Sequence, residues 1–325
     1  MKKPIIAWRA VVAAVALAMT AAACGAGSTD SGGANAAGPE IRLGVGIDAS
    51  YAHIFLADQK GLFAKHGVNV KVVQFGRGGE AVDAIAAGQV QLAGLSDVTA
   101  IGKLQQIPDL RAMFKYEESG SYVKVVQRDG VSDAKQIKKM AIVPGISEFA
   151  ALRFLESKKI DPKSVKFVTA DPPEIPVLLQ KGDVDAFVLW EPWPAKALEL
   201  GGKTAGTTGD FGVQSVHWLV TDATWLNGNQ DAAAKIANAL AEASAMAESD
   251  PQAAAQAAQK VAKIPPALTL TAIKEIDFGV RDITAADLAG YEAVAKFYVD
   301  TGKVKSLPDV RAVVLQNWAS QHTGK

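Results

Sequence analysis

One short pattern occurs twice in this chain and restricts its fold more than any other feature. A helical stretch ends at a glycine, a short apolar run follows, and the run stops at polar or aromatic residues. The first copy is residues 84–97, with Gly88 at the junction, and the second is residues 182–194, which begins at Gly182. A glycine can close a helix in the left-handed conformation, and a continuous apolar run suits a strand buried on both faces. Two such units predict an α/β chain with two similar lobes.

The ends of these apolar runs are where we expect a ligand, because open α/β sheets bind ligands beyond the carboxyl ends of their strands. Trp190, Glu191 and Trp193 follow the second run, so two indoles flank a carboxylate. In the functional interpretation, an indole faces the ligand and Glu191 accepts a hydrogen bond from an ammonium or amide group. In the alternative, both tryptophans fill the core and Glu191 bonds nearby backbone N–H groups.

Six further candidates follow other predicted strands or precede helices. Aromatic side chains follow the first strand, and the loop GRGGE enters a helix whose free N–H groups favour an anion. The serines stand at strand ends, where they either serve ligand oxygens or only cap helices. The loop arginine is alternatively a solvated charge. The candidates are Tyr51, His53, Arg77, Gly78, Ser96 and Ser147.

The N-terminal segment predicts export. Lys2, Lys3 and Arg9 precede an uncharged apolar run that is too short to span a bilayer. Three alanines then precede Cys24, the single cysteine of the 325-residue chain. We therefore expect a signal peptide at residues 1–23, lipidation of Cys24, and a flexible Gly/Ser/Ala-rich tether at residues 24–40. Cleavage without lipidation, giving a secreted or periplasmic soluble protein, is the alternative.

The composition excludes several classes of protein. The chain carries 34 Lys and Arg and 34 Asp and Glu, so it has no basic footprint for nucleic acid. No stretch after the leader is long and apolar enough to be a membrane span. The four histidines and the cysteine show no metal-ligand spacing such as HxxxH or CxxC, so we expect neither a metal nor another cofactor.

Repeated strand–helix units lie on either side of residue 122, and residues 231–325 predict a helical tail without strands. This arrangement predicts a first lobe of residues 41–122 plus 222–325 and a second lobe of residues 123–221. The chain is expected to cross between them near residues 122–127 and 217–221, and the C-terminal helices are expected to return to the first lobe.

From about residue 41 to residue 319, the chain resembles the substrate-binding proteins of ABC importers for nitrate, sulfonates, taurine and related compounds. That group includes binders of thiamine-pyrimidine precursors. The resemblance rests on residues 57–75 (ADQKGLFAKHGVNVKVVQF), 84–94 (AIAAGQVQLAG) and, above all, 181–193 (KGDVDAFVLWEPW). It implies a type II periplasmic-binding fold that closes on its ligand. One departure is Gln91, where the family has an aspartate that this chain keeps only at Asp185.

The resemblance implies a monomeric, extracytoplasmic solute-binding lipoprotein, not an enzyme, that serves an ABC permease and ATPase. Backbone N–H groups at helix starts favour a small oxoanion such as nitrate, an alkanesulfonate or taurine. A carboxylate at Glu191 shifts the expectation toward a zwitterion such as taurine, or toward a neutral heterocycle. A thiamine-precursor binder, a family-related enzyme and a sensor subunit remain alternatives.

Overall fold

The computed structural model describes residues 38–324. The predicted signal peptide, the predicted lipidation site at Cys24 and most of the predicted tether therefore lie outside the described residues. No helix within residues 38–324 has both the length and the apolar character needed to cross a membrane.

The first sheet has six strands, in the order β11-β4-β10-β3-β1-β2. β1, β2 and β3 run parallel, whereas β10 runs antiparallel to β3 and β4. The parallel strands bring their carboxyl ends to one edge, and β10 begins at that same edge. The strands are β1 Ile41–Val45, β2 Val70–Gln74, β3 Leu92–Ser96, β4 Leu110–Ser119, β10 Ser215–Asp222 and β11 Asp277–Arg281.

The second sheet has five strands, in the order β7-β6-β8-β5-β9. β6, β7 and β8 are parallel, and β5 is antiparallel to β8 and β9. The strands are β5 Val123–Gln127, β6 Lys139–Ile142, β7 Lys166–Thr169, β8 Ala186–Trp190 and β9 Lys203–Thr207.

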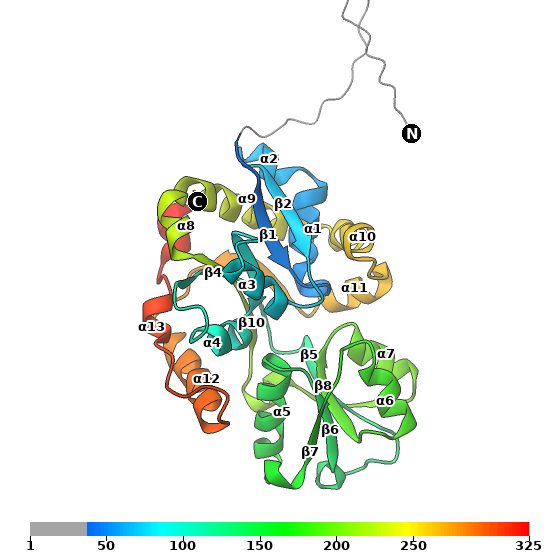
Figure 1. Ribbon diagram of the computed structural model, residues 1–325. Helices are drawn as coiled ribbons and strands as arrows, with labels where there is room; N and C mark the ends of the chain where they lie inside the picture. Colours follow the sequence, from blue (N-terminus) through cyan, green and yellow to red (C-terminus); the bar gives the residue numbers. More distant parts are fainter. Residues whose placement is uncertain (1–37, 325) are drawn as a thin grey trace, which may run out of the picture. The chain divides into compact units, whose positions relative to one another are not determined.

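Helices cover both faces of the second sheet, with α5 on one face and α6 and α7 on the other (Figure 1). These helices are α5 Ile146–Ser157, α6 Ile175–Lys181 and α7 Trp193–Glu199. The first sheet carries α1 Ala52–Gln59, α2 Leu62–Lys65, α3 Gly78–Ala86, α4 Asp97–Lys103, α8 Ala223–Gly228, α9 Gln230–Ser249, α10 Pro251–Ala262, α11 Pro266–Ile273, α12 Leu288–Asp300, α13 Val310–Val313 and α14 Trp318–His322. Four 3-10 turns complete the described chain: η1 Ala49–Tyr51, η2 Ala134–Gln136, η3 Pro162–Ser164 and η4 Thr208–Phe211.

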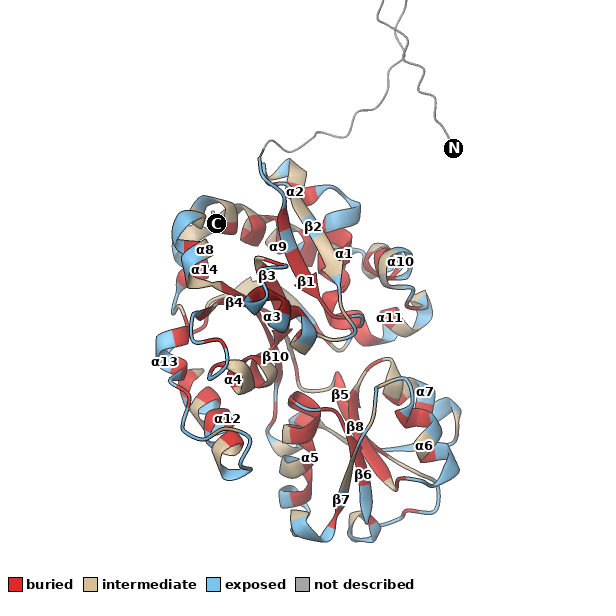
Figure 2. Ribbon diagram, viewed as in Figure 1, coloured by how far each residue is buried: buried red, intermediate tan, exposed pale blue. Residues whose placement is uncertain are grey.

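The inner strands of both sheets are largely buried, whereas the edge strands β2, β7, β9 and β11 are only partly buried and the outer faces of the helices are exposed (Figure 2). The long helix α9 shows why: Ala233, Ile236, Ala237 and Leu240 recur at helical spacing and are fully buried. That apolar face lies in one cluster with residues of α1, so burial of apolar surface fixes the C-terminal helices on the first sheet.

The predicted two-lobe α/β fold, with C-terminal helices on the first lobe, is confirmed. Gly88 and Gly182 have φ of 67° and 76°, in the left-handed region that these turns require. The predicted second lobe extends to residue 221. The strand Ser215–Asp222, however, pairs with β3 and β4 of the first sheet. We therefore propose that the second lobe ends before Ser215, between β9 and β10, and that the first crossing lies between β4 and β5.

The prediction of a strandless tail after residue 231 is wrong. Asp277–Arg281 forms β11, which pairs antiparallel with β4 at the edge of the first sheet. The sequence pattern did not indicate this strand, because it is short and only partly buried.

Gln91 and Asp185 precede β3 and β8 and have equivalent hydrogen bonds. Gln91 Oε1 accepts from Arg42 N at 2.9 Å, at the start of β1. Asp185 Oδ2 accepts from Lys138 N and Lys139 N at 2.8 and 2.9 Å, at the start of β6. Each side chain therefore links its strand to the start of the parallel neighbouring strand. Gln91 thus makes the same kind of contact in the first sheet that Asp185 makes in the second.

Candidate functional site

A cavity of about 290 Å³ lies where the carboxyl ends of strands from both sheets meet. From the first sheet it is lined by the residues after β1 and β3, by the start of α3 and by the start of β10. From the second sheet it is lined by residues at the start of β5, between β6 and α5, and at the end of β8. The lining is Asp48, Tyr51, Arg77, Gly78, Gly79, Glu80, Asp83, Leu95, Ser96, Thr99, Lys103, Tyr122, Val123, Val143, Pro144, Ile146, Trp190, Ser215 and His217.

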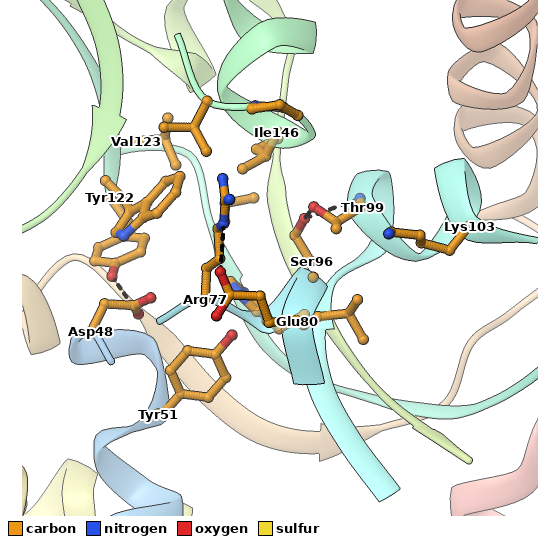
Figure 3. A pocket seen from close by; sticks show the side chains of 18 of the residues that line it. Asp48, Tyr51, Arg77, Glu80, Ser96, Thr99, Lys103, Tyr122, Val123 and Ile146 are labelled. Carbon is orange, nitrogen blue, oxygen red and sulfur yellow. Dashed lines mark hydrogen bonds and ion pairs between the residues drawn. The ribbon is translucent and has the colours of Figure 1, made fainter. Parts of the chain in front are cut away.

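Asp48 and Tyr122 join the two sides of this cavity (Figure 3). Asp48 is the N-cap of η1, and its Oδ1 accepts from Ser50 N at 2.9 Å. Tyr122 Oη lies 2.9 Å from the same Oδ1 and 3.0 Å from the carbonyl oxygen of Glu191. A residue between β4 and β5 therefore connects the end of β1 to the end of β8.

The start of α3 comes close to the cavity because Gly78 has no side chain. A Cβ at Gly78 would lie 2.6 Å from Leu95 Cβ and 2.7 Å from Tyr51 Oη, which no substituted residue could accommodate without movement. Gly78 and Gly79 thus present backbone at the cavity wall, where helix-start N–H groups favour negative charge. Arg77, the N-cap residue, has its Nε 3.2 Å from Glu80 Oε1 (Figure 3).

Three neighbouring strands place Ser96, His217 and Glu117 side by side beneath the cavity. Ser96 caps α4 through Thr99 N at 3.2 Å and also lines the cavity. His217 Nδ1 bonds Glu117 Oε2, and both residues are buried. The cavity floor therefore contains an imidazole with a carboxylate behind it.

Burial is the largest single influence on the pKa values of the ionisable groups at and beneath this cavity. Desolvation raises the pKa values of the Asp48 and Glu117 carboxyls, although His217 partly opposes both shifts. Burial by itself would lower the pKa of His217, but the adjacent Glu117, together with Asp48 and Asp97, outweighs it and raises that pKa. Burial also raises the pKa of Asp97 to about 7. Within residues 38–324, no group of three or more His, Cys, Asp or Glu side chains is arranged to hold a metal.

Five of the sequence-predicted candidates meet at this cavity: Tyr51, Arg77, Gly78, Ser96 and Trp190. Their role in binding stays a prediction. The other four lie elsewhere, each for a physical reason.

Glu191 does not line the cavity, contrary to our functional interpretation. Its Oε1 accepts from Lys124 Nζ at 2.5 Å, and its Oε2 accepts from Ala195 N at 3.0 Å in the first turn of α7. Lys124 also bonds Glu275 at 2.7 Å. The alternative reading, a structural acid bonded to nearby backbone, describes this residue.

Trp193 packs against the apolar cluster of the second sheet with α6 and α7. Trp190 touches that cluster too, but it also lines the cavity. Trp193 therefore packs against the core, whereas Trp190 both packs against the core and lines the cavity.

His53 and Ser147 belong to the core. His53 is fully buried between Tyr116 and Phe278, with ring centroids at 5.1 and 4.7 Å, and neither ring nitrogen has a hydrogen-bond partner in the described chain. Ser147 Oγ accepts from Val143 N at 2.9 Å and donates to Val188 O at 2.5 Å, so it joins β6 to β8.

Sequence reasoning missed Asp48, Tyr122, Ser215 and His217 as cavity residues. Asp48 follows the first strand, as Tyr51 does, so the strand-end rule should have included it. Ser215 and His217 begin an antiparallel strand, and the rule does not cover strands that start at the binding edge.

The comparisons with known proteins agree with this architecture. Residues 34–262 match the model of the NMT1-like family. The chain is 29% identical over 188 residues to the taurine-binding periplasmic protein of Escherichia coli (strain K12), an alignment that covers 55% of this chain and 58% of that relative. The chain thus spans less than two thirds of the relative's length.

Two solved structures share the fold. The periplasmic aliphatic sulphonate binding protein of Escherichia coli superposes with a TM-score of 0.78 at 18% identity, over 88% of this chain and 100% of that one. The periplasmic nitrate-binding protein of Synechocystis PCC 6803 superposes with a TM-score of 0.72 at 17% identity, over 87% and 88%. At such identities the likeness concerns the fold alone. Because the family model matches well over half of the sequence, the chain belongs to the NMT1-like family.

Proposed function

We propose that this protein captures a small sulfonate or related oxoanion in the cavity between its two sheets and delivers it to an ABC permease. The observation that carries the proposal is the start of α3 at the cavity wall, where Gly78, Gly79 and Arg77 present backbone and a guanidinium. An anion is favoured by both. The sequence likeness to a taurine-binding periplasmic protein supports the same ligand class.

In this proposal the protein is a monomeric binding protein without enzymatic activity. Residues of both sheets line the one cavity, which supports a mechanism in which ligand bridges two half-sites and favours the closed form. The closed form would then be the species that docks on the permease.

Calorimetric titration of the purified protein with ethanesulfonate, taurine and nitrate tests the ligand class. We expect at least one sulfonate to bind, and Arg77→Gln to weaken that binding about tenfold to hundredfold, because a charge-assisted hydrogen bond contributes about 1.5–3 kcal/mol. Failure of every oxoanion to bind would refute the proposal.

Arg153→Gln is a matched control for this titration. Arg153 pairs with Glu156 three residues later, as Arg77 pairs with Glu80, but it lies outside the cavity. We expect Arg153→Gln to leave sulfonate affinity within about threefold of the wild type. Equal weakening by both variants would show a loss of general positive charge and would contradict a local anion site.

A flat heterocycle is a second candidate, favoured by the aromatic side chains of Tyr51, Tyr122 and Trp190 around the cavity. The same titration, extended to a thiamine-precursor pyrimidine, separates the two. Binding of the pyrimidine without binding of any sulfonate would select the heterocycle.

We also propose that lipid on Cys24 holds the protein on the extracytoplasmic face of the membrane. The support is the order of leader, cysteine and Gly/Ser/Ala-rich tether in the sequence. Cys24→Ala should move the protein from the membrane fraction to the soluble fraction. If the wild-type protein is already found in the soluble fraction, the anchoring proposal is wrong and the protein is secreted without a lipid anchor.

A further inference from the structure

Asp48 differs from the other charged side chains at the cavity, because no cation pairs with it anywhere in residues 38–324. Every other charge at this site has an opposite partner within the chain. The cavity therefore contains one acid more than its cations can balance. The balanced pairs are Arg77 and Glu80 at 3.2 Å, Lys103 and Asp83 at 2.7 Å, and His217 with Glu117.

The hydrogen bonds that Asp48 accepts come from neutral groups, and all of them involve its Oδ1. Its Oδ1 accepts from Ser50 N at 2.9 Å and Ser50 Oγ at 2.5 Å, and Tyr122 Oη lies 2.9 Å away. Its Oδ2 receives no hydrogen bond from the described chain, and the residue lines the cavity while being only 7% exposed. Desolvation raises the pKa of this carboxyl in spite of the nearby His217. A ligand cation would therefore supply the compensation that the ionised carboxylate lacks.

The surroundings of Asp48 suit a small cation. Tyr51, Tyr122 and Trp190 line the same cavity, and aromatic rings attract ammonium groups electrostatically. Ser215 also lines the cavity, is 1% exposed, and has a hydroxyl without a partner in the described chain. A primary ammonium carries three N–H donors and therefore needs several acceptors at once. Asp48 and Ser215 offer unused acceptors in one cavity.

We propose that Asp48 is the specificity-determining residue of an ammonium subsite, so that the preferred ligand is an aminosulfonate whose amine lies against Asp48. This inference rests on the proposed function, because the sulfonate end of the ligand is assigned to the start of α3. It adds that a sulfonate without an amine binds more weakly.

The test compares taurine with ethanesulfonate, which lacks only the amine, by calorimetry at constant pH and ionic strength. We expect the wild type to prefer taurine by about tenfold to hundredfold, as a charge-assisted hydrogen bond implies. Asp48→Asn keeps Oδ1 as an acceptor for Ser50 and removes the charge. It should reduce the preference for taurine to about threefold or less while leaving ethanesulfonate affinity equal or higher.

Glu199→Gln is the matched control, because it removes one carboxylate charge from an exposed pair with Lys196 on α7, away from the cavity. The preference for taurine should survive in this variant. If Glu199→Gln abolished the preference as Asp48→Asn does, the effect would be long-range charge and the subsite would be refuted.

The wild-type comparison alone keeps the inference falsifiable if Asp48→Asn does not fold. Equal binding of taurine and ethanesulfonate would overturn the ammonium subsite and leave the proposed function intact. If neither sulfonate binds, the proposed function fails. The subsite then fails too, unless millimolar ethanolamine binds the wild type and not Asp48→Asn.

Discussion

The units that end in β3 and β8 can be compared from the start of each strand to its end. At the start, Gln91 and Asp185 both tie their strand to its parallel neighbour. At the end of β3, Ser96 caps α4 and still lines the cavity. At the end of β8, Trp190 lines the cavity, but Glu191 is held by Lys124 and by the first turn of α7.

The acid that remains available at the cavity lies after a third strand, β1. Glu191 has a cationic partner, whereas Asp48 has only neutral donors. These two buried carboxylates follow strands at different places in their sheets, β1 and β8, and they differ in that only Glu191 is paired with a lysine.

Among the variants that test this comparison, we expect the largest effect from removing the carboxylate of Glu191. Glu191→Ala leaves Lys124 with Glu275 as its partner in a buried setting. We expect the free energy of unfolding to fall by about 3–5 kcal/mol, because a buried charge-assisted hydrogen bond to Lys124 is lost and Ala195 N in α7 loses its acceptor. Urea denaturation measures this, and ligand titration should show little change. If the variant is stable but has lost ligand affinity, Glu191 contacts the ligand and our assignment of it to a structural role is wrong.

The two tryptophans after β8 should separate stability from binding. Trp193→Ala should cost about 3 kcal/mol of stability, because its contacts are with the apolar cluster of the second sheet. Trp190→Ala should cost a similar amount of stability, because Trp190 packs against two apolar clusters, and should also weaken ligand binding about tenfold, because it lines the cavity. Thermal unfolding and calorimetry on both variants check this. Equal effects of the two variants on ligand affinity would contradict a binding role for Trp190 alone.

Removing the unpartnered imidazole of His53 should stabilise the protein. His53→Phe keeps a ring between Tyr116 and Phe278 and removes two buried nitrogens without partners. We expect a gain of about 1–3 kcal/mol at pH 7, the penalty of an unsatisfied buried polar group. Urea denaturation at pH 7 measures the gain. A loss of ligand affinity with no gain in stability would favour the original assignment of His53 to the ligand site.

The same variant should change the acid sensitivity of the fold. Burial, assisted by the charge of His217, lowers the pKa of His53 to about 3 from its ordinary value of 6.5. The unfolded chain therefore takes up this proton first, so the wild type loses stability as the pH falls from about 6.5 toward 3. His53→Phe should lose less stability over that range. Identical acid-denaturation curves for the two proteins would contradict a neutral, buried His53.

The smallest expected effect concerns the hydroxyl that joins the two strand ends. Tyr122→Phe removes the contacts with Asp48 and with the Glu191 carbonyl. We expect a stability loss of about 0.5–1.5 kcal/mol, the net contribution of one hydrogen bond. Chemical denaturation measures it, with Tyr298→Phe, whose hydroxyl bonds the Val98 carbonyl within the first lobe, as a control for stability alone. Ligand affinity should fall in Tyr122→Phe and not in Tyr298→Phe.

Local patterns determined much of the architecture. The left-handed turns at Gly88 and Gly182 and the buried runs after them follow from glycine chemistry and from apolar periodicity, which act over a few neighbouring residues. The place of the cavity at the strand ends follows from sheet geometry, and the cavity contains five of the nine candidate residues. The edge strand β11 escaped prediction because a short, half-buried strand has a weak pattern.

Only the tertiary structure decided which polar side chain meets which partner. Lys124 binds Glu191 across 67 residues of sequence, and Tyr122 meets Asp48 across 74. His217 faces Glu117 across 100 residues, through the register of two antiparallel strands. Such pairs form when packing brings distant segments together, and no local propensity or spacing encodes them. The sequence therefore determined where the cavity lies, and long-range pairing decided that Asp48, not Glu191, is the acid that lines it without a cationic partner in the described chain.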